Sequence, residues 1–278
     1  MGGGGKETGS TILYFAGLIM LRKLFRYLAA FGIYPKLVTS SLKGWSFFRK
    51  DLYELRRQAK GRTEFLLADH YPILRERFET NGDLKSHYFH EDLLVAQRVF
   101  ENNPLKHVDV GSRVDGFVAH VASFRSIEVF DIRPQQAQVK NITFLTADFM
   151  NIPQELHNYT DSLSSLNVIE HFGLGRYGDP VDYDGHIKGL DNMRKVLKQG
   201  GKFYLSTPIG PQRIEFNAHR VFSVAYLLKL FEPYYSIDRF SYVDDNGDLH
   251  TDVELEPSGV AENFGCSFGF GIFEMTKL

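Results

Sequence analysis

A glycine turn and an acidic residue twenty positions later are the first side chains in this sequence that could do chemistry. The turn is Asp109-Val110-Gly111-Ser112, which follows a short hydrophobic segment. Gly111 permits a tight turn and a close approach of a ligand to the backbone, and free N–H groups at the start of a following helix favour an electronegative partner. The turn matches neither the GxGxxG pattern nor a phosphate loop, so alone it is equally typical of a structural turn.

Two further segments add the groups that recognise a nucleoside. Asp131 ends the segment Val129-Phe130-Asp131, and an acid at the carboxyl end of a second parallel strand accepts the hydroxyls of a ribose. Asp131 could instead cap a helix or lie solvated in a loop before Pro134. Further on, Asp148 could accept the amino group of an adenine while Phe149 covers the ring.

The segment Asn167-Val168-Ile169-Glu170-His171-Phe172 contains the candidate catalytic residues. A His or a carboxylate within hydrogen-bond reach of a hydroxyl can remove its proton, so His171 and Glu170 are candidates for a general base. Glu170 could instead orient His171 or cap the next helix, and His171 could have a structural role in its turn.

Polar residues in the connections after the fourth and fifth strands are candidates for binding a substrate. Asp179, Asp182, Asp184 and His186 form an acidic cluster that could hold a divalent ion. The cluster lacks a fixed oxygen-ligand spacing, so we expect solvated loop acids and no metal ion. The candidate substrate-binding residues are Tyr177, His186, His219 and Arg220.

The elements that position these residues alternate between strand and helix from Lys106 onward. This alternation predicts right-handed βαβ units and a mainly parallel sheet, closed by an antiparallel pair near the C-terminus. The expected strands are His107–Val110, Ser126–Phe130, Ile142–Leu145, Ser162–Val168, Gly201–Ser206, Tyr235–Val243 and Gly271–Lys277, and the expected helices between them are Val114–Phe124 and Lys188–Lys198.

The ordered segments DVGS, VFD, ADF, NVIEHF and GGKFYLSTP resemble the class I methyltransferases that use S-adenosyl-L-methionine (SAM). The resemblance covers about residues 106–278. The segments EHFGLGRYGDP and FNAHRVF are similar to a more particular family of uncharacterised methyltransferase-like proteins, known mainly from bacteria and nematodes. The resemblance implies a Rossmann-like class I methyltransferase sheet, preceded here by an N-terminal helical segment.

The resemblance also implies a role for each matching residue. Asp109, Gly111 and Ser112 would line the methionine end of SAM, and Asn167 would form the floor near the sulfonium. The sequence has Arg113 where a second glycine is common in the family, and this side chain could fold outward or block the site. In the same comparison Asp131 would bind the ribose, and Asp148 and Phe149 the adenine.

Charge is distributed unevenly along the chain and excludes some classes of partner. Residues 22–62 contain eleven Lys or Arg and two acidic residues, a net charge of +9, whereas residues 63–278 contain twenty basic and thirty-one acidic residues, a net charge of -11. Because proteins that bind nucleic acid usually present a basic face, we expect no nucleic-acid substrate. The single cysteine, Cys266, cannot form an internal disulfide, and a cytoplasmic location is the default expectation.

The N-terminal part is predicted to contain a flexible tail at residues 1–19, which could derive from cloning, and a basic helical segment at residues 20–105 before the domain at residues 106–278. Leu21, Leu24, Phe25, Leu28 and Phe31 have helical spacing, with basic residues off their stripe. Such a helix packs on the body of the domain or on a second subunit, or it lies on an anionic membrane. We therefore expect either peripheral membrane contact or a homodimer through residues 20–62. The apolar run is interrupted by charges before it reaches the length of a membrane-spanning helix.

Three functions remain open at this point. The first is methyl transfer from SAM to an oxygen or nitrogen of a small molecule or glycan intermediate. The second is a nicotinamide-dependent oxidoreductase, which also places an acid about twenty residues after a glycine loop, although the missing GxGxxG pattern counts against it. The third is a module that binds SAM without catalysis, which Arg113 suggests.

Overall fold

The computed structural model describes residues 20–21, 23–65 and 67–278. The expected tail at residues 1–19 lies outside the described residues. The chain divides into two compact units between Gly82 and Asp83. The second unit therefore includes a helix that the sequence analysis assigned to the N-terminal segment.

The first unit is helical, as expected. Residues 23–30 are helical, and α2 spans Pro35–Gln58. Proline is well suited to the first position of a helix because its missing N–H would have no partner there. The chain then returns through a short 3-10 helix, η1 (Glu76–Phe78), and crosses α2 at Gly44, where a β-carbon would lie 1.8 Å from the carbonyl oxygen of Leu74. Among the described residues, no helix combines the length and the apolar character needed to cross a membrane.

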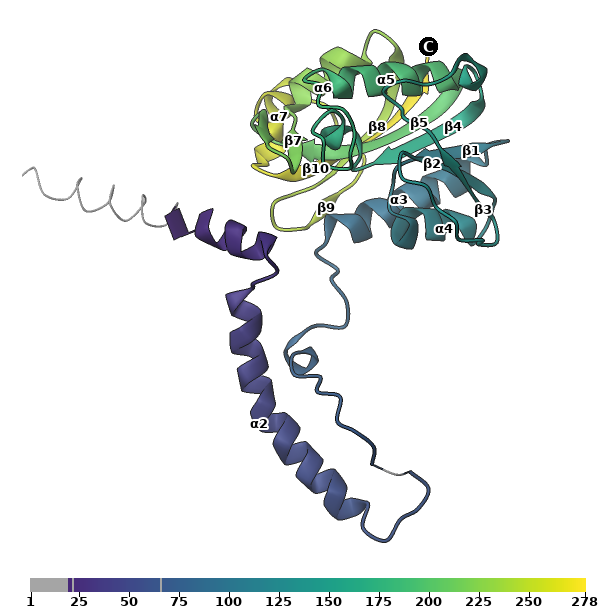
Figure 1. Cartoon of the computed structure of the whole chain (residues 1–278). Helices are drawn as coiled ribbons and strands as arrows, with labels where there is room; N and C mark the ends of the chain where they lie inside the picture. Colours follow the sequence, from purple (N-terminus) through teal and green to yellow (C-terminus); the bar gives the residue numbers. More distant parts are fainter. Residues whose placement is uncertain (1–19, 22, 66) are drawn as a thin grey trace, which may run out of the picture. The chain divides into compact units, whose positions relative to one another are not determined.

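The second unit is built on one eight-stranded sheet in the order β3-β2-β1-β4-β5-β10-β8-β9 (Figure 1). The pairs among β1 to β5 are parallel, and β10 lies antiparallel between β5 and β8. The expected Rossmann-like sheet with an antiparallel C-terminal pair is confirmed. The strands are β1 (His107–Val110), β2 (Ile127–Asp131), β3 (Ile142–Thr146), β4 (Thr160–Leu166), β5 (Leu197–Ile209), β8 (Tyr235–Val243), β9 (Leu249–His250) and β10 (Gly269–Lys277).

Helices cover both faces of this sheet (Figure 1). One apolar cluster joins the sheet to α5 (Gly185–Val196) and α6 (Val224–Phe231), and a second joins it to α3 (His87–Asn102) and α4 (Ala119–Ala122). Alternate residues of β5 enter the two clusters, as the two-residue period of a strand requires. The remaining short elements are the π-helical turn η2 (Val114–Val118), the 3-10 helices η3 (Gln154–Leu156), η4 (Ile169–His171) and η5 (Asn263–Gly265), the helix α7 (Pro257–Ala261) and the hairpin of β6 (Arg213–Glu215) and β7 (His219–Val221).

The helix expected at Val114–Phe124 is not continuous. It begins as η2, breaks at Gly116, whose backbone angles are not helical, and continues as the single turn α4. The reason is the neighbouring helix: a β-carbon on Gly116 would lie 2.1 Å from the carboxylate of Asp92 on α3. Close packing of α3 therefore overrides the helical pattern of this segment.

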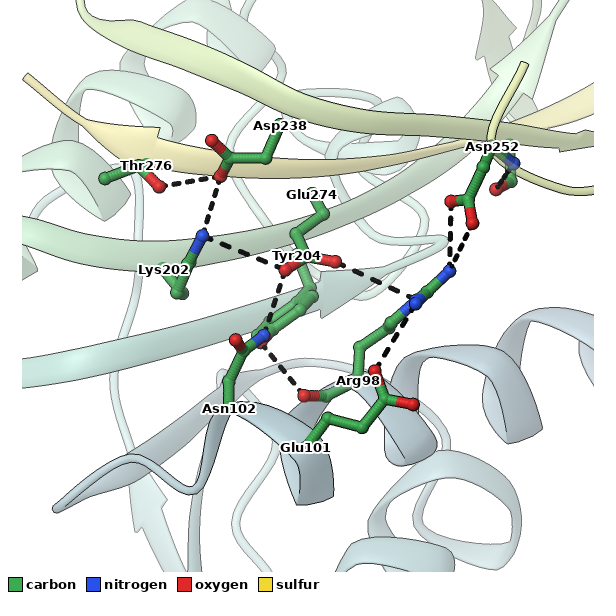
Figure 2. A network of polar contacts seen from close by, with 10 residues as sticks. Arg98, Glu101, Asn102, Lys202, Tyr204, Asp238, Asp252, Glu274 and Thr276 are labelled. Carbon is green, nitrogen blue, oxygen red and sulfur yellow. Dashed lines mark hydrogen bonds and ion pairs between the residues drawn. The ribbon is translucent and has the colours of Figure 1, made fainter.

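A polar network fastens the C-terminal half of α3 to the sheet (Figure 2). Arg98 donates to both carboxylate oxygens of Asp252 at 2.9 Å. Asn102 donates to the Tyr204 hydroxyl at 2.6 Å and to Glu274 at 2.9 Å. These bonds fix the helix along its axis, and its N-terminal half then reaches the carboxyl ends of the strands.

Candidate functional site

Two adjacent cavities open at the carboxyl ends of β1, β2, β3 and β4, where ligands bind in open α/β sheets. Both cavities are formed within the second unit. The first is lined by ends of these strands and by Phe149, and the second extends from η2 to the β6–β7 hairpin. The residues that line both cavities are Gly111, Asp131, Arg133, Asn167, His171 and Tyr177.

The glycine turn is shaped by buried hydrogen bonds. Gly111 has a φ of +73°, and a β-carbon there would lie 2.8 Å from a methyl carbon of Val168. The carboxylate of Asp109 is fully buried and accepts from the Ser112 hydroxyl at 2.6 Å, the Ser112 N–H at 2.9 Å and the Ser164 hydroxyl at 2.6 Å. Burial raises the pKa of Asp109 to about 6. These hydrogen bonds let Asp109 fix the conformation of the turn, but Asp109 itself lines neither cavity. Ser112 lines the second cavity, and Gly111 lines both.

Asp131 is the last residue of β2 and lines both cavities, but its carboxylate already accepts three hydrogen bonds from Arg133. Oδ1 of Asp131 accepts from the Arg133 N–H at 2.8 Å and from Nε at 2.9 Å, and Oδ2 accepts from the guanidinium at 2.7 Å. Side-chain exposure is 18% for Asp131 and 56% for Arg133. The sequence analysis missed Arg133, although its position two residues after a strand-end acid suits such a bond.

The first cavity contains the two residues expected at an adenine. Oδ1 of Asp148 accepts from the Met150 N–H at 2.8 Å, and its other carboxylate oxygen makes no hydrogen bond within the described part of the chain. Phe149 is only 3% exposed and lies edge to face against Phe130, with their ring centroids 5.6 Å apart. Phe149 therefore belongs to the hydrophobic core and at the same time forms part of the wall of the first cavity.

Asn167 lies between the two cavities and is held by a residue that the sequence analysis did not identify. Its backbone is left-handed, with a φ of +58°, a conformation that Asn tolerates better than most residues. Its Nδ2 donates to Glu91 on α3, while its Oδ1 has no hydrogen-bond partner among the described residues. Glu91 is fully buried, and burial raises the pKa of its carboxyl well above the usual range. No local motif marks Glu91, because only the packing of α3 brings it beneath the site.

His171 has a defined tautomer. Its Nδ1 lies 2.7 Å from the carbonyl oxygen of Ala218 in the β6–β7 hairpin, and because a carbonyl only accepts, Nδ1 donates the proton. Burial, and then the charge of Arg176, lowers the pKa of His171 to about 4. At neutral pH the ring is therefore uncharged, and Nε2 retains a lone pair.

Glu170 is the second predicted catalytic residue, and it is 2% exposed. Burial raises its pKa to about 8, so its carboxyl is protonated at neutral pH. It accepts from the Thr207 hydroxyl at 3.3 Å and lies 3.8 Å from Nε2 of His171. The two predicted catalytic groups are thus adjacent and both uncharged at neutral pH, so His171 can accept a proton and Glu170 can donate one.

The four candidate substrate residues separate into two pairs. Tyr177 lines both cavities, and His219 lines the second, where its ring packs on Phe268 with the centroids 4.9 Å apart. His186 and Arg220 are not brought to either cavity. His186 is 5% exposed and bonds to the Tyr226 hydroxyl at 2.9 Å.

Arg220 supports the loop that follows β4. Its guanidinium is 4% exposed and donates to the carbonyl oxygens of Phe172 at 2.6 Å and Tyr183 at 3.0 Å. Asp179 anchors the same loop by accepting from the N–H groups of Gly173 and Gly175 at 2.9 and 3.2 Å. Asp182, another member of the acidic cluster, accepts from the N–H of Asp184 at 2.9 Å in the same loop. No group of three or more potential ligands for a metal ion is found among the described residues.

Arg113 lines the second cavity together with the glycine turn. Its guanidinium donates to Asp115 at 3.0 Å and lies 4.6 Å from the ring centroid of Tyr88, and both of these residues line the same cavity. The side chain is 49% exposed, so it forms part of the cavity wall and also contacts solvent.

Comparisons with known proteins give a family and several solved structures of limited similarity. No curated protein matches the sequence. The solved structure of 1,6-didemethyltoxoflavin-N1-methyltransferase from Burkholderia thailandensis is 13% identical, with a TM-score of 0.49 over 68% of this chain and 79% of that chain. The N-methyltransferase NodS from Bradyrhizobium japonicum is 10% identical, with a TM-score of 0.45 over 69% and 88%. The cyclase SpnF is 13% identical, with a TM-score of 0.48 over 71% and 85%. At such identities these similarities say nothing about the activity of this chain.

The model of one protein family, described as Caenorhabditis protein of unknown function, DUF268, matches residues 115–260. The match extends from η2 to α7 and contains Asp131, Asn167 and His171. Because the matched residues make up more than half of the 278-residue chain, this chain belongs to the DUF268 family.

Proposed function

We propose that this chain is a SAM-dependent methyltransferase that acts on an oxygen or nitrogen of a small molecule or glycan intermediate. The observation that carries the proposal is the first cavity. It places Asp131 and Asp148, from the ends of β2 and β3, beside the wall formed by Phe149. This combination suits a nucleoside, with a carboxylate for the ribose, a carboxylate for the adenine and an aromatic wall between them.

Three features of the chain fit SAM. Gly111 lines both cavities and carries no side chain, so a ligand can lie against its backbone. Asp148 retains a free carboxylate oxygen, and Oδ1 of Asn167 is buried without a partner among the described residues, so both can accept from a ligand donor. SAM, when bound, supplies an electrophilic methyl group on its sulfonium.

The chain would contribute positioning and a proton acceptor. Aligning two reactants can lower an activation barrier by about 7 to 11 kcal/mol. Most of the rate enhancement would therefore come from the side chains that line the two cavities and align SAM with the acceptor. Nε2 of His171 would take the proton of an acceptor hydroxyl while the acceptor oxygen bonds to the methyl carbon and the bond between that carbon and sulfur breaks, which would leave S-adenosylhomocysteine as the product. Oε1 of the neutral Glu170 carboxyl, 3.8 Å from Nε2, would face the N–H that the protonated ring then carries.

The proposal extends to the organisation of the protein. We assign the cofactor-binding elements to residues 106–278, because all residues proposed to contact SAM follow Lys106. The helical unit that ends at Gly82 would serve attachment, and the protein would be cytoplasmic, with or without peripheral membrane contact.

A metabolite panel with labelled SAM tests the proposal and identifies the acceptor. We expect label transfer to one class of compound, and His171→Asn should lower the rate by about 10²- to 10⁴-fold while the affinity for S-adenosylhomocysteine (SAH) is kept. His157→Asn is the control, because His157 is exposed and lines neither cavity. An unchanged rate in His171→Asn would assign His171 a structural role, and the absence of transfer to any compound would leave the chain as a binding module.

A further inference from the structure

The second cavity carries an excess of positive charge. Three arginines line it, and two of them are paired: Arg113 with Asp115 at 3.0 Å and Arg133 with Asp131 at 2.7 Å. Arg176 forms no ion pair within the part of the chain that the structure describes, and it donates to the carbonyl oxygen of Ala218 at 2.9 Å. One guanidinium is therefore uncompensated at the wall of the cavity.

The other ionisable groups of this cavity do not cancel the charge. Burial keeps Glu170 protonated at neutral pH by raising its pKa to about 8. Burial likewise lowers the pKa values of His171 and His87 to about 4, so both rings are neutral. The cavity thus combines neutral polar groups with an unpaired cation.

A ribose bound to Asp131 would compete with Arg133 for the carboxylate. Oδ1 already accepts from the backbone N–H and from Nε of Arg133, and Oδ2 accepts from its guanidinium. Since a carboxylate offers about four lone-pair sites, a ribose that places two hydroxyls there would displace at least one of these three bonds. Two of the three come from the Arg133 side chain, which is 56% exposed and lines the second cavity.

Arg133 and Arg176 share a contact with one aromatic ring. Both guanidinium groups are over the ring of Tyr177, with their central carbons 4.6 and 5.3 Å from its centroid. Tyr177 itself lies edge to face with His171, with the ring centroids 5.6 Å apart. A group bound by these two arginines would therefore lie beside the proposed base.

We propose that the second cavity binds the methyl acceptor through an anionic group, a carboxylate or a phosphate, held by Arg176 and by the Arg133 that the cofactor releases. This inference rests on the proposed function and adds the class of substrate. It also sets an order, because the cofactor would have to bind first to free Arg133.

The test uses the full chain and simple probes. Binding of 4-fluorobenzoate, 4-fluorophenyl phosphate and the neutral 4-fluorobenzamide is followed by fluorine NMR, with and without saturating SAH. We expect at least one anion to bind about tenfold more tightly than the amide when SAH is present, and less tightly without it. Which anion is preferred separates a carboxylate acceptor from a phosphate acceptor.

Substitutions of Arg176 test whether this side chain binds the anion. Arg176→Gln should weaken binding of the anion about tenfold and leave binding of the amide unchanged, and Arg176→Lys should restore part of the loss. Arg239→Gln is the matched control, because Arg239 is exposed on β8 and lines neither cavity. No preference for anions, or a preference that Arg176→Gln does not change, would overturn the inference.

SAH separates this inference from the proposed function. If SAH abolishes anion binding, the anion site is the place of the cofactor's own carboxylate and the inference is wrong. If SAH does not bind at all, the proposed function fails, and an anion preference that still depends on Arg176 supports the anion site alone.

Discussion

At the scale of single residues, Asp131 is the side chain on which the proposed recognition of a nucleoside depends most. We predict that Asp131→Ala weakens the binding of SAH by about 1 to 3 kcal/mol, because the ribose hydroxyls lose a charged acceptor. Calorimetry measures this directly. Asp191→Ala is the control, since Asp191 also forms ion pairs, with Arg194 and Lys195, but lies outside both cavities. Equal affinities in wild type and Asp131→Ala would show that Asp131 only anchors Arg133.

The raised pKa of Glu170 should make the free energy of unfolding depend on pH. Its carboxyl ionises near the ordinary value of 4.5 in the unfolded chain and near about 8 in the folded one. Between these values the folded state binds one more proton, so this group lowers the free energy of unfolding by about 1.4 kcal/mol for each unit that the pH rises. Above pH 6.5, the ordinary pKa of histidine, the buried histidines no longer oppose this trend.

Between pH 6.5 and 8, ionisation of Glu170 should lower the free energy of unfolding of the wild type by up to about 2 kcal/mol. The variant Glu170→Gln should lack this part of the pH dependence. Denaturant titrations at several pH values measure it, and Glu155→Gln, an exposed residue of η3, should keep the wild-type slope. Parallel curves for Glu170→Gln and wild type would contradict protonation of Glu170 in the folded protein.

Sequence reasoning found the residues of the site that follow strands directly, and it missed those that reach the site from elsewhere. Asp131 was identifiable because parallel strands end at the same edge of a sheet. Glu91 was not, since its position depends on how α3 packs. Arg220 and His186 were assigned to the substrate from their place in the chain, but a loop residue can point toward the core as easily as toward a ligand.

At the scale of elements, the turn between β1 and η2 requires glycine for two separate reasons. Gly111 and Gly200 share a φ of +73°, but only at Gly111 would a β-carbon meet other atoms, with Val168 at 2.8 Å. We predict that Gly200→Ala loses about 1 kcal/mol from backbone strain alone, and that Gly111→Ala loses at least about 1 kcal/mol more from the steric conflict. Thermal or denaturant unfolding of both variants gives the difference, and equal losses would show that Val168 moves aside without cost.

The sheet was more predictable than its helices. Strand positions follow from short apolar runs between turns, and these runs located all the main strands to within a few residues, except that β5 begins at Leu197. The helix at Val114–Phe124 failed because Asp92 on α3 approaches the backbone at Gly116. Such a contact involves two distant segments, and neither periodicity nor propensity within one segment reveals it.

At the scale of the whole molecule, the division at Gly82 separates a basic helical unit from the unit that contains both cavities. Leu21, Leu24, Phe25 and Phe31 are 44% to 82% exposed in the first unit. We predict that the full chain floats with vesicles containing phosphatidylserine, because apolar contact adds to about 1 kcal/mol for each basic residue near the surface. Added salt should release it, and vesicles of phosphatidylcholine alone are the control. Failure to bind anionic vesicles at low salt would leave packing against a second subunit as the role of these residues.

The most direct test of the central claim is calorimetry of the purified full chain with SAM, SAH and NAD. The proposed nucleoside site of Asp131, Asp148 and Phe149, together with a turn that lacks the dinucleotide glycines, predicts that SAM and SAH bind more tightly than NAD. Tighter binding of NAD than of both sulfur-containing ligands would contradict the account.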